Sequence, residues 1–264
     1  MLTTVQCLAS QISNTPLYTN YQMSRIGNYY NDFYRELSII DERSNTFKKI
    51  KSFLPYLYGS ETFLDIGCGH GGVSSELIKL GYNVAGIEIN DEAINSLQSK
   101  GFKTYQRDIT NPLNINSKFD IILILDVLEH LFDPLNLLKQ AKDITNNNGY
   151  IIVTTPLYFD ILDRLKILFT GSIISMDNLC YGRDNYLKFR SYNYDHIRFF
   201  KPKDIIEIGE RLDLLVDKIE YTSAVYMGES KLIKLLFKII ANKYTVDYNP
   251  SLLAHSMKIR WKVC

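Results

Sequence analysis

The chain has 264 residues, of which 46% are hydrophobic and 22% are charged, and its formal net charge is +1. That length and apolar content suffice for one buried core with a small appended region, while the near-zero net charge excludes a strong field that would attract nucleic acid or a membrane. The four scattered cysteines form no C-x-x-C pair, so we expect reduced thiols in a cytoplasmic protein rather than a disulfide framework or a zinc site.

Residues 1–40 are expected to form a loosely organised N-terminal segment ahead of a single domain over residues 41–264. The first twenty residues lack the basic and apolar regions of a signal peptide, and no apolar run reaches the roughly 18 residues of a membrane span. A helix is predicted over Asp41–Tyr58, where apolar residues recur at helical spacing. These residues are Phe47, Ile50, Phe53, Leu54 and Leu57.

Strands and helices are expected to alternate from residue 62 to Pro156. Strands are predicted at 62–66, 83–89, 102–107, 119–125 and 149–155, and helices at 71–80, 91–100 and 134–146. The strands are continuous apolar runs, as expected when helices cover both faces of a parallel sheet. This alternation predicts a doubly wound α/β domain of the Rossmann-like kind, in which ligands bind beyond the carboxyl ends of the strands.

The regular alternation breaks after Pro156. Two inserted segments, at about 157–195 and 223–250, are expected to form a lid over the pocket. Between and after them we predict a helix at Lys201–Arg211, a strand at Leu214–Tyr221, a basic amphipathic helix at Lys231–Tyr244 and a last strand at Leu252–Val263. The amphipathic helix either docks on the core or makes a peripheral contact with a lipid surface or a lipid-linked substrate.

The segment Phe63–Gly72, with the sequence FLDIGCGHGG, reads as a buried strand that runs into a glycine loop and then a helix. Glycines at 67 and 69 allow backbone angles that other residues avoid and leave no Cβ between the chain and a ligand. Together with Gly72 they also satisfy the G-x-G-x-x-G pattern, and Glu88 follows about twenty residues on at the end of the second strand. This loop alone therefore fits NAD, FAD and S-adenosylmethionine (SAM) equally well.

Two later motifs distinguish these cofactors. Asp108 follows the third predicted strand, where its carboxylate can accept a hydrogen bond from an adenine amino group, and the segment Asp126–His130, with the sequence DVLEH, follows the fourth. With the glycine loop and Glu88, these motifs resemble the class I SAM-dependent methyltransferases. The resemblance covers residues 40–156 well and residues 195–222 more loosely.

The resemblance implies a mostly parallel seven-stranded sheet with an antiparallel last strand, and SAM as the cofactor. The acid at 65 would lie near the methionine end, the loop along the methionine and ribose, Glu88 at the ribose, and Asp108 at the adenine. The residues expected to contact the cofactor are Asp65, Gly67, Cys68, Gly69, Glu88, Ile89, Asp108, Ile109 and Asp126. The pair Tyr29–Tyr30 matches an aromatic segment that touches the cofactor in relatives, although plain surface packing explains it equally well.

His130 and His196 are the candidate catalytic residues, because an unperturbed imidazole titrates near neutrality and can act as a general base. With Asp126 and Glu129 they could instead bind a divalent metal, as in the magnesium-dependent 2′-O-methyltransferases of small-RNA 3′ ends and the ubiquinone-pathway O-methyltransferases. Aspartate at the first position weakens that match, and a helix-capping Glu129 beside a packed histidine is the simpler interpretation. No metal ligand is therefore assigned.

The sequence predicts a SAM-dependent methyltransferase that acts on a small-molecule or glycan- or lipid-linked acceptor, most plausibly at oxygen. An Asn/Asp-Pro-Pro-aromatic motif of amino-group methylation is missing after the fourth strand, and the near-neutral charge argues against a nucleic-acid partner. Two alternatives stay open: a metal-assisted 2′-O-methyltransferase of an RNA 3′ end, and a catalytically silent SAM-fold partner protein. The sequence does not indicate an oligomeric state.

Overall fold

In the computed structural model, the described residues are 47, 50–171, 196–223, 235 and 239–264. The chain divides into two compact units. Unit 1 contains Met1–Ser60 and Gly67–Leu113, and unit 2 contains Glu61–Ile66 and Asn114–Cys264. The predicted N-terminal segment 1–40, including Tyr29 and Tyr30, lies outside the described residues.

The described residues of unit 1 include the parallel strands β2 (Asn83–Glu88) and β3 (Lys103–Gln106) and the helices α4 (Gly72–Lys79) and α5 (Asp91–Ser99). Strand β2 is almost fully buried and pairs with β3 from Ala85 opposite Lys103. Asn90 precedes helix α5, and its side chain caps the helix by accepting a hydrogen bond from the Ala93 N–H at 2.6 Å. Side-chain oxygens of this kind satisfy the unpaired N–H groups at a helix start.

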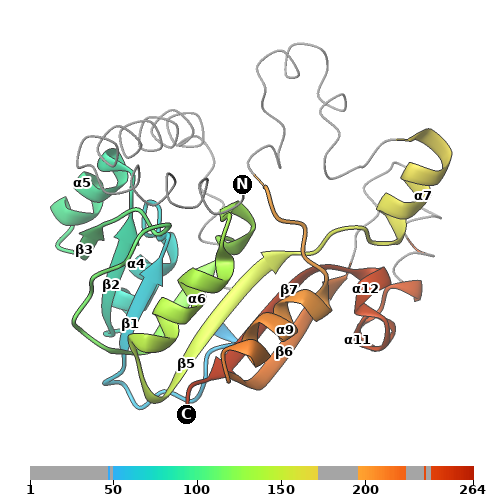
Figure 1. Cartoon of the computed structure of the whole chain (residues 1–264). Helices are drawn as coiled ribbons and strands as arrows, with labels where there is room; N and C mark the ends of the chain where they lie inside the picture. The colour runs from blue at the N-terminus through green and yellow to red at the C-terminus, as the bar shows by residue number, and fades with distance from the viewer. Residues whose placement is uncertain (1–46, 48–49, 172–195, 224–234, 236–238) are drawn as a thin grey trace, which may run out of the picture. The chain divides into compact units, whose positions relative to one another are not determined.

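The described residues of unit 2 include the strands β1 (Thr62–Ile66), β4 (Phe119–Leu125), β5 (Thr145–Pro156), β6 (Leu215–Ser223) and β7 (Ala254–Lys262). They also include the helices η1 (Leu128–His130), α6 (Pro134–Asp143), α7 (Ile161–Thr170), α9 (Pro202–Arg211), α11 (Lys243–Tyr248) and α12 (Pro250–Leu253). Helix α6 packs on β5, and α9 and α11 pack on β6 (Figure 1).

The seven strands are ordered β3-β2-β1-β4-β5-β7-β6. The β1–β4 and β4–β5 pairs are parallel, whereas β7, the last strand of the chain, runs antiparallel to both β5 and β6 (Figure 1). Strand β4 is buried at most positions, as expected for a strand covered on both faces. The predicted doubly wound, mostly parallel sheet with an antiparallel last strand is therefore confirmed.

Several predicted boundaries are wrong for identifiable reasons. The first helix does not continue to Tyr58, since residues 52–54 form a turn before Pro55, and a residue that precedes proline disfavours the helical conformation. The helix predicted to end at 146 ends at Asp143, because β5 already begins at Thr145. Helix α7 lies in the first insertion, where no element was assigned.

The predicted amphipathic helix at 231–244 falls largely outside the described residues. Its described end is not one continuous helix, because residues 241–242 form a turn and α11 begins at Lys243. Asn242 causes the break: its side-chain oxygen accepts hydrogen bonds from the backbone N–H groups of Tyr244 and Thr245, which is the role asparagine prefers at a helix start. No helix among the described residues combines the length and apolar character needed to cross a bilayer.

The core of unit 2 includes a close approach between α9 and the indole of Trp261 on β7. Trp261 is fully buried, and a Cβ added at Gly209 would lie 2.4 Å from its Nε1 and 2.6 Å from its Cε2. Real Cβ atoms do not come this close to a rigid ring, so only glycine fits this position of the helix.

Replacing Gly209 by alanine should therefore destabilise the protein by about 1–3 kcal/mol, the usual cost of overpacking a core. The sign of this change in unfolding free energy is informative, because replacing glycine by alanine in a helix interior normally stabilises a protein by about 1 kcal/mol. Urea unfolding of the wild-type and variant proteins measures the effect. In a Trp261→Phe background the added cost should shrink, and an equal cost in both backgrounds would place the clash elsewhere.

Candidate functional site

The glycine loop of unit 1 has three left-handed glycines, with φ values of 72° at Gly67, 52° at Gly69 and 74° at Gly71. The N–H groups of Gly67 and Cys68 both donate to the carbonyl of Ile87 on β2, at 2.9 and 3.0 Å. The N–H of Gly71 donates to the Cys68 carbonyl at 2.9 Å. These three donors are therefore used inside the unit, where they fix the conformation of the loop.

Glu88 holds the loop against the end of β2. Its Oε2 accepts a hydrogen bond from the Gly69 N–H at 2.8 Å, and its Oε1 accepts from the N–H groups of Ile89 and Asn90 at 2.8 and 3.0 Å. The side chain is buried, and hydrogen bonds from N–H groups to a carboxylate are stronger than those to a neutral acceptor. Glu88 is thus fixed in position, and its Oε2, which accepts only one of these three bonds, keeps a lone pair for a ligand hydroxyl.

Asp108 lies after β3 and is also buried. Its Oδ1 accepts hydrogen bonds from the N–H and hydroxyl of Thr110, at 2.9 and 2.6 Å, and its Oδ2 accepts one from the Asn111 amide at 3.0 Å. The carboxylate therefore shapes its own turn as well as offering an acceptor. The neighbouring candidates Ile89 and Ile109 are half-buried, and Cys68 is buried.

These residues of unit 1 suit a nucleoside that carries hydroxyl groups and an amino group. Glu88 at the end of β2 and Asp108 after β3 are both buried. When ionised, their carboxylates can only accept hydrogen bonds. A ribose diol and an exocyclic adenine amino group are the matching donors.

The other two acidic candidates, Asp65 and Asp126, belong to unit 2. Asp65 is buried on β1, opposite Leu123 of β4. Asp126 is exposed, has a left-handed φ of 54°, and accepts a hydrogen bond from the Thr154 hydroxyl at 2.8 Å. Aspartate tolerates this backbone conformation better than most residues, which explains an acid directly after β4.

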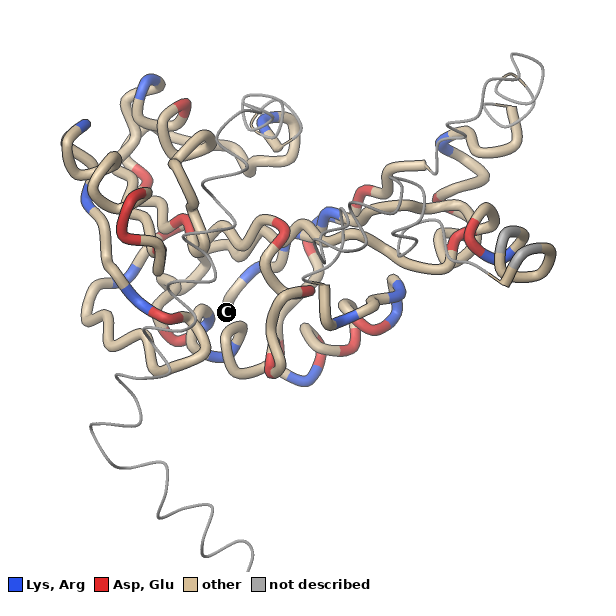
Figure 2. The backbone as a smooth tube through the Cα atoms, turned by 90° about the horizontal axis from the view of Figure 1, so that it is seen from above, with Lys and Arg blue, Asp and Glu red and all other residues tan. Residues whose placement is uncertain are grey.

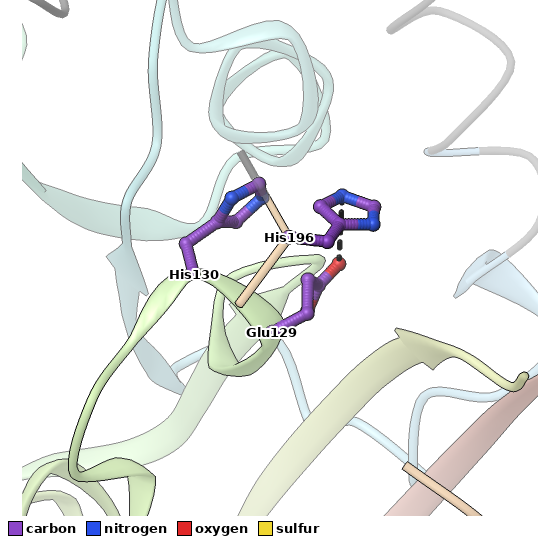
Figure 3. A group of neighbouring side chains, drawn as sticks. All are labelled: Glu129, His130 and His196. Atoms are coloured by element: carbon purple, nitrogen blue, oxygen red, sulfur yellow. Dashed lines mark ion pairs between the residues drawn. The ribbon is translucent and has the colours of Figure 1, made fainter. Parts of the chain in front are cut away.

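Glu129, His130 and His196 form the main cluster of unit 2 (Figure 3). One nitrogen or oxygen of each lies within 4.8 Å of the others, and the ring centroids of the two histidines are 4.7 Å apart. His196 Nε2 is 4.0 Å from Glu129 Oε1. Glu129, His130 and His196 therefore lie close together, as the sequence predicted, whereas Asp126 does not belong to this cluster.

The cluster is assembled by backbone hydrogen bonds from residues 196–200. The carbonyl of Glu129 accepts from the N–H groups of Ile197 and Arg198, at 2.9 and 3.0 Å. The Arg198 side chain also donates to the carbonyls of Leu131 and Phe132. These bonds fix the chain just after His196 against η1, and so bring together two histidines that are far apart in the sequence.

Burial raises the pKa of Glu129 to about 8, and the carboxylate of Asp126 adds to the rise while His130 opposes it. The side chain is fully buried, so the charged form lacks the water that would stabilise it. Glu129 Oε2 lies 3.3 Å from the Thr155 hydroxyl, and Oε1 has no hydrogen-bond partner among the described residues. Glu129 therefore carries a proton at neutral pH.

This raised pKa predicts a pH dependence of stability. Between about pH 4.5 and pH 8 the folded protein binds one more proton at Glu129 than the unfolded chain does, so stability falls as the pH rises through this window, by at most about 1.4 kcal/mol per pH unit. In urea titrations over this range, wild type should lose stability more steeply than Glu129→Gln. Parallel curves would contradict the raised pKa.

The sequence did not indicate Tyr158, which the structure places beside His196. The Tyr158 hydroxyl makes a short hydrogen bond with His196 Nδ1, and its ring packs edge-on against Phe199 at 4.9 Å. Tyr158 is buried, two residues after β5. No spacing rule could have found it, because its partner lies at the far end of the first insertion.

Residues 38–219 match a family model described as a methyltransferase domain. The chain is 22% identical over 166 residues to the ubiquinone biosynthesis O-methyltransferase of Shewanella pealeana, a match that covers 60% of this chain and 64% of the relative. The corresponding protein of Pelagibacter ubique is 26% identical over 163 residues, covering 60% and 62%. The chain thus spans less than two thirds of the length of these relatives.

Among solved structures, the fold resembles the magnesium protoporphyrin IX methyltransferase of Synechocystis PCC 6803 with bound S-adenosylhomocysteine. The TM-score is 0.57 at 15% identity, and the match covers 91% of this chain and 99% of the other. A methyltransferase structure from Thermotoga maritima gives the same TM-score at 15% identity, covering 90% and 99%. At this level of identity the likeness establishes the fold.

Proposed function

The chain belongs to the class I SAM-dependent methyltransferases, and from this premise we propose that it transfers a methyl group from SAM to a hydroxyl oxygen of a small acceptor. The observation that carries the proposal is the pairing of His196 with Glu129 and His130 in unit 2. It places two imidazoles and a neutral carboxyl group where an acceptor proton can be taken up.

We assign cofactor binding mainly to unit 1. Glu88 would accept hydrogen bonds from the ribose hydroxyls, because its carboxylate is already oriented by three backbone N–H groups. Asp108 would accept from the adenine amino group, and the loop around Gly67 and Gly69 would lie along the methionine and ribose. Bound SAM supplies a methyl group on a positively charged sulfur, which an oxygen nucleophile can attack in line.

We assign proton acceptance to His196, with His130 as the alternative. An acceptor hydroxyl becomes a better nucleophile as it loses its proton, and a neutral imidazole can take that proton near neutral pH. Glu129 is a poorer base in the isolated protein, because burial raises its pKa to about 8 and keeps it protonated at neutral pH. Alignment of the acceptor supplies much of the remaining rate.

A small acceptor fits the chain better than a nucleic acid. Basic and acidic residues are interspersed along the described backbone (Figure 2), and the net charge is only +1, whereas a nucleic-acid footprint needs a concentration of Lys and Arg. The two relatives described above are both named as O-methyltransferases, which supports transfer to oxygen. A glycan- or lipid-linked hydroxyl stays within the proposed class.

Calorimetry with SAM and S-adenosylhomocysteine, followed by turnover against a panel of hydroxylated acceptors, tests this function. We expect saturable binding of both ligands and release of S-adenosylhomocysteine with at least one acceptor. Binding without turnover on a panel that includes phenols, sugars, lipid-linked alcohols and an RNA 3′ end would favour the catalytically silent alternative. Saturable NAD binding without SAM affinity would overturn the proposal.

A metal-assisted version of the same reaction is a second candidate, supported by the three donor atoms of Glu129, His130 and His196. Two imidazoles and a carboxylate suit several divalent transition metals. A metal would have to displace the proton of Glu129, so its binding should release a proton and strengthen as the pH rises. Calorimetry with Mn²⁺ or Zn²⁺ in buffers of different ionisation enthalpy measures that release, and EDTA should then reduce turnover.

A further inference from the structure

The carboxylate of Asp108 accepts three hydrogen bonds from the turn that follows β3, residues 108–111. From this arrangement we infer that Thr110 and Asn111 are positioning residues: they fix Asp108 so that its Oδ2 selects the 6-amino group of adenine against a 6-oxo group. The inference rests on the cofactor role proposed for unit 1, and it names the residues that give that role its base selectivity.

The backbone of this turn is anchored to β2 and to the core of unit 1. The N–H of Arg107 donates to the carbonyl of Glu88 at 3.0 Å, and the N–H of Asn111 donates to the carbonyl of Asp108 at 3.1 Å. Just after the turn, Leu113 is only 2% exposed. The backbone of Asp108 therefore lies at a fixed place relative to Glu88, the proposed ribose acceptor, and only the rotation of its side chain is left to be set.

The three donors set that rotation. Oδ1 accepts from the N–H and the hydroxyl of Thr110, at 2.9 and 2.6 Å, and Oδ2 accepts from the Asn111 side-chain amide at 3.0 Å. An ionised carboxylate can only accept hydrogen bonds, so the direction of all three is defined. The last torsion of an aspartate is otherwise broad, so these bonds select one orientation. Both lone pairs of Oδ1 are used, whereas Oδ2 accepts only one of the three bonds and keeps a lone pair for a ligand.

A carboxylate held in this way distinguishes purines by the group at their C6 position. The amino group of adenine is a donor and matches the remaining lone pair of Oδ2, whereas the carbonyl of hypoxanthine is an acceptor and leaves that oxygen unpaired. Hypoxanthine does carry an N–H on the neighbouring ring nitrogen, from which a carboxylate that is free to turn could accept instead. Because Thr110 and Asn111 prevent Asp108 from turning, they exclude this second pairing.

The test is calorimetry with S-adenosylhomocysteine and S-inosylhomocysteine, whose purine has an oxo group in place of the 6-amino group. We expect wild type to bind the inosyl ligand about 10-fold to 100-fold more weakly. The double variant Thr110→Val/Asn111→Leu removes two of the three bonds and should bring the two Kd values close together. Each single variant keeps two bonds and should give an intermediate ratio, and Thr110→Ser, which keeps the hydroxyl, should retain the wild-type ratio. Thr110 and Asn111 are exposed, so these variants should fold.

Two controls separate base selectivity from the other contacts of unit 1. Thr104→Val removes a hydroxyl from β3 that accepts a hydrogen bond from the Gln98 amide at 3.1 Å, and it should leave both affinities as in wild type. Glu88→Gln should weaken both ligands by the same factor, because they share the ribose, and so should leave the ratio of the two Kd values unchanged.

A turn that is merely loosened would weaken both ligands alike. An unchanged ratio in the variants of Thr110 and Asn111 would therefore overturn the inference, as would equal binding of the two ligands by wild type, even if the enzyme proves active. Selective binding that depends on the two residues, in a protein without turnover, would support the inference and remove the methyl-transfer proposal. Binding of neither ligand by wild type would overturn both.

Discussion

Glu88→Ala should lose SAM affinity by about 1–3 kcal/mol, which corresponds to roughly a 5-fold to 150-fold rise in Kd. The substitution removes the proposed ribose acceptor and leaves the N–H groups of Gly69, Ile89 and Asn90 without the carboxylate to which they donate. The glycine loop then keeps only the hydrogen bonds of Gly67 and Cys68 to the Ile87 carbonyl of β2, so part of the entropic cost of ordering it falls on binding. Calorimetry with SAM and S-adenosylhomocysteine measures both affinities.

Glu88→Gln is the matched control for this effect. The amide oxygen of the glutamine can still accept hydrogen bonds from some of the three backbone N–H groups. The negative charge is lost, however, and the NH₂ group of the glutamine faces other N–H donors, with which it cannot form hydrogen bonds. An intermediate loss of affinity is therefore expected, with unfolding stability closer to wild type than that of Glu88→Ala. Wild-type affinity in both variants would mean that Glu88 anchors the loop without meeting the ribose.

His196→Ala should reduce turnover by about 100-fold to 10,000-fold, the usual contribution of a general base. The fall should appear in kcat with little change in SAM affinity, because the proposed cofactor contacts of Glu88 and Asp108 are made by other residues. Steady-state release of S-adenosylhomocysteine with a saturating acceptor measures kcat, and calorimetry measures the cofactor affinity.

His255→Ala provides the control for loss of a histidine. The His255 side chain is 57% exposed and lies 3.6 Å from Asp160, away from the cluster of Glu129, His130 and His196. Its removal should leave kcat near the wild-type value. If His196→Ala were equally active, the base would have to be His130 or the acceptor would need none.

The sequence was sufficient for the elements whose signals are local. The strands β1 to β4 were predicted to within about a residue. Apolar runs identified β1, β2 and β4, which are largely buried, whereas β3 has the polar sequence KTYQ and is partly exposed. The left-handed loop at Gly67 and Gly69 could be anticipated because glycine alone adopts such angles freely. Glu88 was placed correctly at the end of β2, although its ribose role stays a prediction.

Features that depend on distant pairs could not be anticipated. The fit of Gly209 against Trp261 joins a helix to the last strand, and the hydrogen bond of Tyr158 to His196 joins the two ends of an insertion. The raised pKa of Glu129 arises from burial that only the folded chain creates. The break at Asn242 was readable in principle, because asparagine is a strong helix-capping residue, but the apolar and lysine spacing around it favoured a continuous helix.

The backbone pairing of Tyr158 with Phe200 gives the segment between them a closed stem. Loop-closure entropy grows slowly, by about 0.6 kcal/mol for each doubling of length, so a segment that starts and ends at one fixed stem can change in length at small cost to the fold. The part of such a segment that precedes His196 can diverge between related proteins while His196 keeps its hydrogen-bonded backbone position beside Glu129. An exchange of the proposed lid with that of another methyltransferase should therefore end before His196, so that residues 196–200 and the proposed base are kept.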